Sequence, residues 1–443
     1  MAFDMSQHLS LPRLLRFTLP SIGMMICMSA YVIADGFFVS NFCGSTALAA
    51  VNFAYPVPMI MGTTGFMLGT GGGAIVARTR GEGKDDVACE QFSLFVFAAL
   101  AFGFASALIA CVGLRPLMIA LGATGPMLEL ACSYGLIVCT GIPATVLQYV
   151  FQELMVTAGK PRMGFLVTVA AGITNVALDY LFIVHLQVGV TGAAIGTIAG
   201  EAVGGLIPLV YFMLPNDTPL RITRPRIRWR WLGEAMVNGS SEMVSNIAAS
   251  VVTMAYNVQL LQFLGNDGVA AYSVISYVWM AFSGAFIGFV VGVNPLMGYQ
   301  YGAKNHKEMS SIFRKSLLTV ASLGLIMLVV TRLAAQPLAH AFVGYDPHLE
   351  ELTAHAFEVY SLAFTVVGFN FYASGLFTSL GNGFLSALIA FARLFVFEVG
   401  YVFLLPMLLG PDGIWLSALV AHSTALVLSA SLVGANGKRY GYL

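Results

Sequence analysis

Charged residues are scarce in this 443-residue chain, because Lys, Arg, Asp and Glu together make up only 9% of it. Soluble domains average about 25%. Hydrophobic residues make up 58%, and the mean hydropathy is +0.83, an excess that a water-soluble core cannot absorb. The formal net charge is zero, so no basic field favours nucleic acid as a partner. We therefore predict an all-α polytopic membrane protein.

Motifs for catalysis and cofactors are also lacking. The six cysteines show no CxxC metal spacing, and the glycine-rich stretch at 69–73 is not followed by the Lys-Ser/Thr of a P-loop. Neither HExxH nor GxSxG occurs, and the histidines are scattered. A membrane enzyme would need a paired nucleophile and base or a metal cluster. We therefore expect no enzyme activity and no cofactor.

Apolar windows long enough to cross a bilayer, which takes about 20 residues, occur twelve times. They lie near 13–39, 46–76, 91–114, 128–157, 162–186, 190–214, 235–263, 270–300, 310–333, 350–380, 383–408 and 413–435. With the N-terminus inside, all but three of the 21 Lys and Arg residues fall on the inner face; Arg115 and Arg332 fall outside, and Arg393 lies within a span. This positive-inside bias predicts that both termini are cytoplasmic. The short loops suggest a bacterial inner membrane.

An internal repeat divides the chain into two halves. A shift of 221 places Leu48-Ala49-Ala50 on Val269-Ala270-Ala271, and Gly81 on Gly302. We predict two parallel six-helix lobes at 1–214 and 232–443, related by a pseudo-twofold axis along the membrane normal. A cytoplasmic linker at 215–231 joins them. Parallel repeats of this kind are a transporter architecture.

Acidic residues inside the predicted spans are functional candidates, because a carboxylate in hydrocarbon is unfavourable. They are Asp35, Glu153, Asp179, Glu201 and Glu242. The topology places Asp35, Asn175, Asp179 and Thr197 at one depth in the outer half of the membrane, with Asn175 and Asp179 four apart on one helix face. Their oxygens suit either Na⁺ or a proton shared between two acids. The shift of 221 gives no such set in the second lobe, so we expect the site in the first lobe alone.

Two further acids are predicted to contact the substrate together with Asp35. Glu242, at the start of the seventh span, is either a substrate or proton site facing the cavity or an acid capped by serine at the helix entry. Glu153, in the fourth span, has a similar but weaker signal. Arg393 and Glu398 share the eleventh span, where we expect them to neutralise other buried groups.

These features resemble those of the multidrug and toxic compound extrusion (MATE) family over nearly the whole chain. The resemblance rests on Asp35-Gly36-Phe37-Phe38-Val39, Ala158-Gly159-Lys160-Pro161, Asn175-Val176-Ala177-Leu178-Asp179 and Gly189-Val190-Thr191-Gly192-Ala193-Ala194. It implies a V-shaped pair of lobes that exports cationic amphipathic compounds as Na⁺ or H⁺ enters. It also implies a cation site at Asp35, Asn175, Asp179, Ala193 through its carbonyl, and Thr197, and Glu242 matches the family's seventh-helix acid. The tenth span reads Phe369-Asn370-Phe371-Tyr372 and lacks the acid that some members carry there.

We therefore predict a secondary active antiporter that works as a monomer in the lipid bilayer and exports cationic organic small molecules. Na⁺ and H⁺ both remain open as the coupling ion. The alternative is a lipid-linked oligosaccharide flippase of the same superfamily, which would need cationic groups in its cavity to hold pyrophosphate. Arg393 is the one clear base within the spans, and this disfavours the alternative.

Overall fold

The computed structural model describes residues 3–443, and every regular element in that range is a helix. The first half contains α1 (Leu11–Phe42), α2 (Ser45–Ala54), α3 (Pro56–Gly81), α4 (Asp85–Ala120), α5 (Gly125–Thr157), α6 (Pro161–Asp179), the π-helix η1 (Tyr180–His185) and α7 (Val190–Met213). The second half contains α8 (Trp229–Asn238), α9 (Ser240–Gly302), α10 (His306–Val343), α11 (Pro347–Tyr360), the 3₁₀ helix η2 (Ser361–Ala363), α12 (Phe364–Ser379), α13 (Gly383–Phe391), the π-helix η3 (Ala392–Glu398), α14 (Val399–Leu404), α15 (Pro406–Leu409) and α16 (Pro411–Tyr440).

Helix α9 contains two of the predicted spans. Within the described residues, eleven helical segments are long and apolar enough to cross a membrane, and α9 with its 63 residues is one of them. A straight helix of that length would measure about 95 Å, far more than a hydrocarbon core of about 30 Å. Gly265 interrupts α9 with a φ of 63° and a ψ of −150°. Counting the parts before and after Gly265 separately gives the twelve predicted spans.

The backbone repeats itself at the shift read from the sequence. Gly189 has φ 73° and ψ −148°, and Gly410, 221 residues later, has φ 64° and ψ −148°. Gly44, with φ 85°, is likewise the counterpart of Gly265. A positive φ of this kind favours glycine because a Cβ would be strained there. The same special turns therefore occur in both halves, as predicted for two repeated lobes.

The two halves meet in a reciprocal contact near the chain termini. A Cβ added to Gly81 would overlap the carbonyl oxygen of Tyr299, and a Cβ added to Gly302 would overlap that of Arg78. Arg78 and Tyr299 are themselves 221 residues apart. A contact in which each side repeats the other is what a twofold relation produces. The glycines allow α3 and α9 to cross here at backbone distance.

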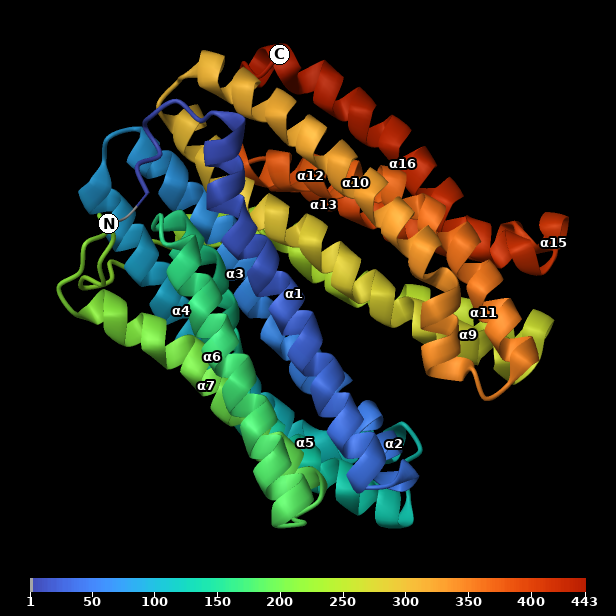
Figure 1. The fold of residues 1–443 in the computed structure, drawn as a ribbon. Coiled ribbons are helices and arrows are strands. Elements are labelled where there is room, and N and C mark those ends of the chain that lie inside the picture. The colour runs from blue at the N-terminus through green and yellow to red at the C-terminus, as the bar shows by residue number, and fades with distance from the viewer. Residues whose placement is uncertain (1–2) are drawn as a thin grey trace.

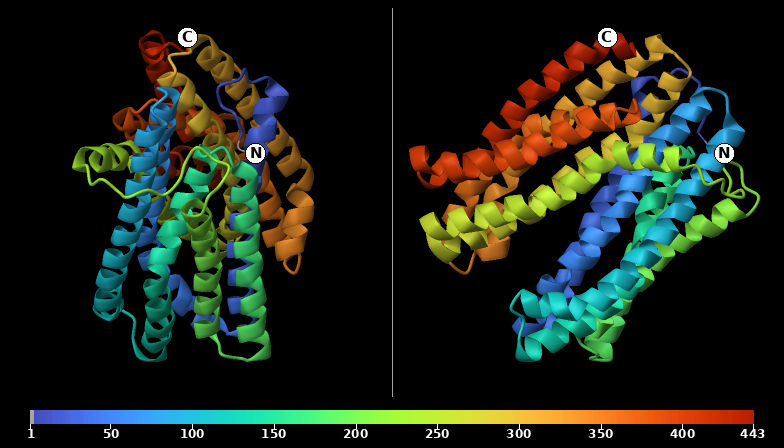
Figure 2. Two further views of the ribbon diagram at one scale, coloured as in Figure 1. Left: turned by 90° about the vertical axis from the view of Figure 1, so that its left-hand side faces the viewer. Right: turned by 180° about the vertical axis from the view of Figure 1, so that it is seen from behind.

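The molecule has the V shape implied by the family resemblance. Figure 1 shows the first half, in blue to green, diverging from the second half, in yellow to red, away from the end that carries both termini. The view from behind in Figure 2 agrees. We call the end with both termini the terminal end and the opposite one the open end. Helices α1 and α3 pack along α9 and form the main contact between the halves.

The residues before α1 bridge the two halves at the terminal end. The Phe3 N–H donates to the Gly159 carbonyl of the first half at 2.9 Å. The Leu9 N–H donates to one carboxylate oxygen of Glu308, at the start of α10, at 2.8 Å. The other Glu308 oxygen lies 2.7 Å from Nδ1 of His8. This N-terminal arm therefore contacts both halves where they meet.

Candidate functional site

Asn175 and Asp179 occupy the last turns of α6, and both are buried, with exposed fractions of 3% and 0%. Oδ1 of Asn175 and both carboxylate oxygens of Asp179 have no hydrogen-bond partner among the described residues. The chain changes to the wider π-helix η1 directly after Asp179. Such segments often occur at functional sites. These polar atoms are therefore buried in the first half without hydrogen bonds to offset the loss of water.

Helix α7 closes tightly over this part of α6. A Cβ added to Gly196 would overlap Oδ1 of Asp179, and one added to Gly200 would lie 3.1 Å from Cβ of Asn175. Thr197, next to Gly196, is half-buried, and its hydroxyl donates to the carbonyl of the buried Ala193 at 3.0 Å. Helix α7 therefore packs directly against the side chains of Asn175 and Asp179. The predicted ligand oxygens of Thr197 and Ala193 are hydrogen-bonded to each other.

Asp35 comes from α1 and completes the predicted set. Its carboxyl group lies close enough to that of Asp179 for the two to interact directly. Oδ1 of Asp35 is also buried without a hydrogen-bond partner among the described residues. Two close carboxylates in a poorly hydrated place are unfavourable while both are charged. The pair can therefore take up either a proton or a small cation.

The described residues contain no group of three or more His, Cys, Asp or Glu side chains able to hold a metal ion. The Asp35 and Asp179 pair supplies only two acids. A cation here would need further oxygens from neutral groups, and Oδ1 of Asn175 is one without a partner. This donor set suits a weakly held monovalent ion, or a proton, better than a resident divalent metal.

Glu201 on α7 extends the acidic region, and the prediction did not include it in the site. The Thr145 hydroxyl of α5 donates to its carboxylate at 2.5 Å. Glu201 is also near enough to Asp35 and to Tyr31 for electrostatic interaction. The available signal was its spacing, because Glu201 follows Thr197 by four residues and so shares its helix face.

Glu153 and Glu242 come from opposite halves and are near enough to interact electrostatically. Glu153 on α5 is 6% exposed and packs against Gly69 of α3. Its carboxyl interacts with that of Glu242, in the first turn of α9. The residue that caps α9 is Gly239, and no side chain makes a capping hydrogen bond there. The serine-capping alternative for Glu242 therefore has no support in the structure.

The second half contains a buried ionic cluster in place of an acid pair. Nε2 of His422 on α16 lies 3.8 Å from Oε2 of Glu398 on η3. Arg393 interacts electrostatically with both Glu398 and Glu242, and its guanidinium lies 4.2 Å from the ring centre of Phe371. Arg393 thus lies among acids, as expected from the sequence. The participation of His422 was not foreseen.

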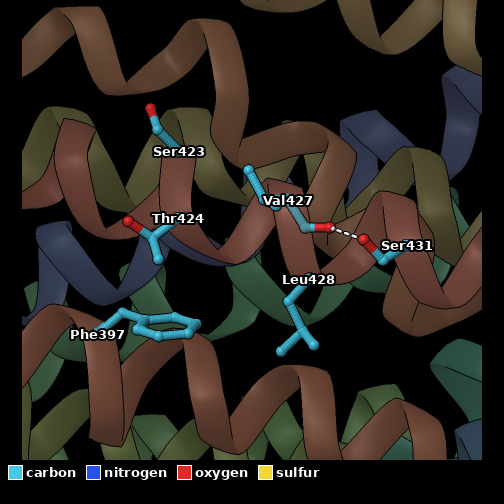
Figure 3. A pocket seen from close by; sticks show the side chains of 6 residues that line it. All are labelled: Phe397, Ser423, Thr424, Val427, Leu428 and Ser431. Atoms are coloured by element: carbon cyan, nitrogen blue, oxygen red, sulfur yellow. Dashed lines mark hydrogen bonds between the residues drawn. The ribbon is translucent and has the colours of Figure 1, made fainter.

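An open groove of about 620 Å³ lies between η3 and α16. Figure 3 shows its lining, which consists of Phe397, Ser423, Thr424, Val427, Leu428 and Ser431. None of these side chains is charged, and the Ser431 hydroxyl already donates a hydrogen bond to the Val427 carbonyl at 2.7 Å. The groove therefore offers a cation no charged partner.

Comparison with known proteins supports the same architecture. The MatE family model matches residues 20–181 and 243–404, one segment in each half. The chain is 24% identical over 423 residues to the multidrug export protein MepA of Staphylococcus haemolyticus, with 95% of this chain and 92% of that protein covered. It is 24% identical over 426 residues to MepA of Staphylococcus aureus, with the same coverages.

Solved structures agree in fold. A structure of MATE in complex with MaL6 superimposes with a TM-score of 0.91 at 22% identity, covering 96% of both chains. An outward-facing multidrug resistance MATE family transporter of the MOP superfamily gives a TM-score of 0.88, also at 22% identity and with 96% of both chains covered.

Proposed function

We propose that this chain, which belongs to the MATE family of membrane transporters rather than to an enzyme family, exports cationic amphipathic compounds in exchange for Na⁺ or H⁺. The observation that carries the proposal is the pair of carboxylates, Asp35 and Asp179, which lie close together in the first half. Similarity to proteins named multidrug exporters supports the substrate class.

The coupling step is neutralisation of the acid pair. An ion that arrives from the open end binds between Asp35 and Asp179 and removes their mutual repulsion. A cationic compound is attracted by the same negative charge, so it is held less tightly once the ion is bound. This difference in affinity between the two states is what a ligand needs in order to shift a conformational equilibrium.

The packing of α7 on α6 can link ion binding to a conformational change. Gly196 touches Oδ1 of Asp179 so closely that the carboxylate cannot move toward α7 unless the helix moves as well. Binding of an ion at Asp179 therefore acts on the relative position of α6 and α7. We assign Asn175 to the same ion site, with Ala193 and Thr197 contributing oxygens if their mutual hydrogen bond opens.

Glu153 and Glu242 are proposed as a second point of contact for the cationic substrate. They come from opposite halves and lie near the junction of α8 and α9. A cation between them would be attracted by both, and its release would follow separation of the halves. Asp35 would complete the substrate path on the side of the first half.

We propose that the terminal end faces the cytoplasm. Most of the basic residues that flank the predicted spans fall on this side, and the Arg80 guanidinium lies there over the ring of Tyr299. The structure would then represent a molecule open to the outside, ready to receive ions and release its substrate. A reporter fused after Leu443 and accessible only from the outside would contradict this orientation.

The flippase alternative would require free basic groups in the path. Arg393, the base within the spans, is 4% exposed and lies among Glu242, Glu398 and the Phe371 ring. It is therefore poorly placed to hold a pyrophosphate.

The test uses purified protein in liposomes with ethidium as a fluorescent cation. A Na⁺ gradient and a proton gradient are imposed separately, and dye movement is followed in wild type, Asp35→Asn and Asp179→Asn. We expect one gradient to drive transport and each substitution to lower the rate at least about tenfold, because each removes one of the two charges that the ion must neutralise. Glu351→Gln, an exposed acid on α11, serves as the control and should transport normally. Normal coupled transport in both aspartate variants would reject the site.

A further inference from the structure

A basic pocket of about 360 Å³ opens at the terminal end, where the two halves join. It lies between the turn from α3 to α4 and the first turns of α8. Four basic side chains line it: Arg78, Lys84, Arg228 and Arg230. Its volume is in the range of pockets that hold small ligands, which starts near 300 Å³. The carboxylates that share the lining are fewer, so the pocket is positive overall.

Two of the four basic groups are already paired. Lys84 lies 2.8 Å from Glu82, and Arg230 lies 2.9 Å from Glu234. Arg78 and Arg228 form no ion pair with any described residue. Arg228 instead lies over the ring of Trp231, 4.5 Å from its centre. Stacking on an aromatic ring leaves the edge of a guanidinium available for a bidentate contact with phosphate.

The pocket also offers an acceptor. Gln91 lines it and is only 4% exposed, yet its Oε1 has no hydrogen-bond partner among the described residues. A buried carbonyl oxygen of this kind is satisfied by a ligand that donates an O–H or N–H. The ligand therefore combines an anionic group for the arginines with a donor for Gln91.

The surroundings indicate where such a ligand comes from. Ile227 and Trp229, beside the pocket, are 69% and 77% exposed. Exposed tryptophan next to arginine is typical of the level of the lipid headgroups. Basic clusters directly beside a membrane span attract anionic lipids.

We propose that this pocket binds the headgroup of an anionic phospholipid with a hydroxylated headgroup, such as phosphatidylglycerol. The phosphodiester lies against Arg78 and Arg228, and a headgroup hydroxyl donates to Gln91. The lining comes from α3 and α4 of the first half and from α8 of the second. A bound lipid therefore connects the two halves at their joint and stabilises the arrangement seen here.

The test measures lipid binding to the full-length protein by native mass spectrometry, starting from protein purified in detergent. Phosphatidylglycerol is titrated against wild type and against the double variant Arg228→Gln/Arg230→Gln. The matched control is Arg221→Gln/Arg224→Gln, which removes two charges from the same linker but none from the pocket lining. We expect about tenfold weaker binding in the pocket variant, and little change in the control.

Several results would overturn the proposal. Equal losses in the two double variants would show general charge attraction and no defined site. Equal binding of phosphatidylcholine would remove the requirement for an anionic lipid. Displacement of the lipid by millimolar inorganic phosphate or glycerol 1-phosphate would point to a soluble phosphate compound. Should the pocket variant fail to fold, Trp231→Leu tests the same site, because it removes the support of Arg228 without changing charge.

Discussion

The substitution Gly196→Ala tests whether the contact between α7 and Asp179 controls ion coupling. Gly196 lies inside α7, where alanine is a better helix former by about 1 kcal/mol. The added methyl group, however, would overlap Oδ1 of Asp179. Real Cβ atoms essentially never approach another heavy atom closer than 3.0 Å. Either the Asp179 carboxylate or α7 itself must therefore move.

The two contributions set the expected size of the effect. Overpacking in a close-packed interior typically costs about 1–3 kcal/mol, so the helix-forming gain offsets part of it. We expect a net destabilisation of at most about 2 kcal/mol, which leaves the protein folded. Function should suffer more, because displacement of a charged ligand group by about 1 Å can lower a rate about 100-fold. We expect ion-driven ethidium transport to fall at least about tenfold.

The assay pairs transport in liposomes with thermal unfolding of the purified protein. Gly113→Ala on α4 and Gly400→Ala on α14 are matched controls, because a Cβ at either position meets nothing within 4 Å. Gly400 is also the counterpart of Asp179 in the second half. Both controls should be as stable as wild type or slightly more so, and should transport normally. A Gly196→Ala protein with wild-type coupled transport would refute the link between α7 packing and the ion site.

Two more predictions concern buried acids elsewhere. Glu398→Gln should lower the unfolding temperature, because it leaves Arg393 with less neutralising charge and breaking a buried ion pair costs about 3–5 kcal/mol. Adding Arg393→Gln should recover part of this loss. Strictly additive losses of stability in the two variants would contradict the pairing. Glu308→Gln should expose the N-terminal arm to trypsin, because the carboxylate that accepts from the Leu9 N–H and contacts His8 loses its charge. The exposed-acid variant Glu351→Gln is the control. Equal rates of tryptic cleavage in the two variants would count against the contact.

The fold was predictable because each of its main features has a local cause. Apolar windows have the length a bilayer requires, and the repeated glycines follow from turns that need a positive φ. Gly265, where α9 is interrupted, lies between the predicted windows 235–263 and 270–300. The helix continues past the window ends on both sides of Gly265. Helix α8 begins at Trp229, inside the stretch 215–231 that the sequence indicates as the linker. Helical boundaries of this kind depend on packing against α3, which the sequence does not reveal.

The acid pair was predictable for a different reason. Topology fixes the depth of a residue in the membrane, and a spacing of four fixes its helix face, so Asn175 and Asp179 could be placed near Asp35. The rotation of one helix against another is not fixed in this way. Two contacts between helices illustrate this: the close approach of Gly196 on α7 to Asp179 on α6, and the hydrogen bond from Thr145 on α5 to Glu201 on α7. Such contacts depend on side-chain packing between helices, so only the structure reveals them.

The two halves differ in how their buried charges are balanced, and this bears on where coupling occurs. In the second half, Arg393 interacts electrostatically with Glu242 and Glu398 and so offsets part of their negative charge. In the first half, Asp35 and Asp179 interact with each other, and no basic side chain among the described residues contributes to that interaction. In the proposed mechanism, an ion or a proton neutralises this pair. Coupling is therefore expected to fail in variants of the acid pair, whereas variants of the Arg393 cluster should lose stability before they lose ion dependence.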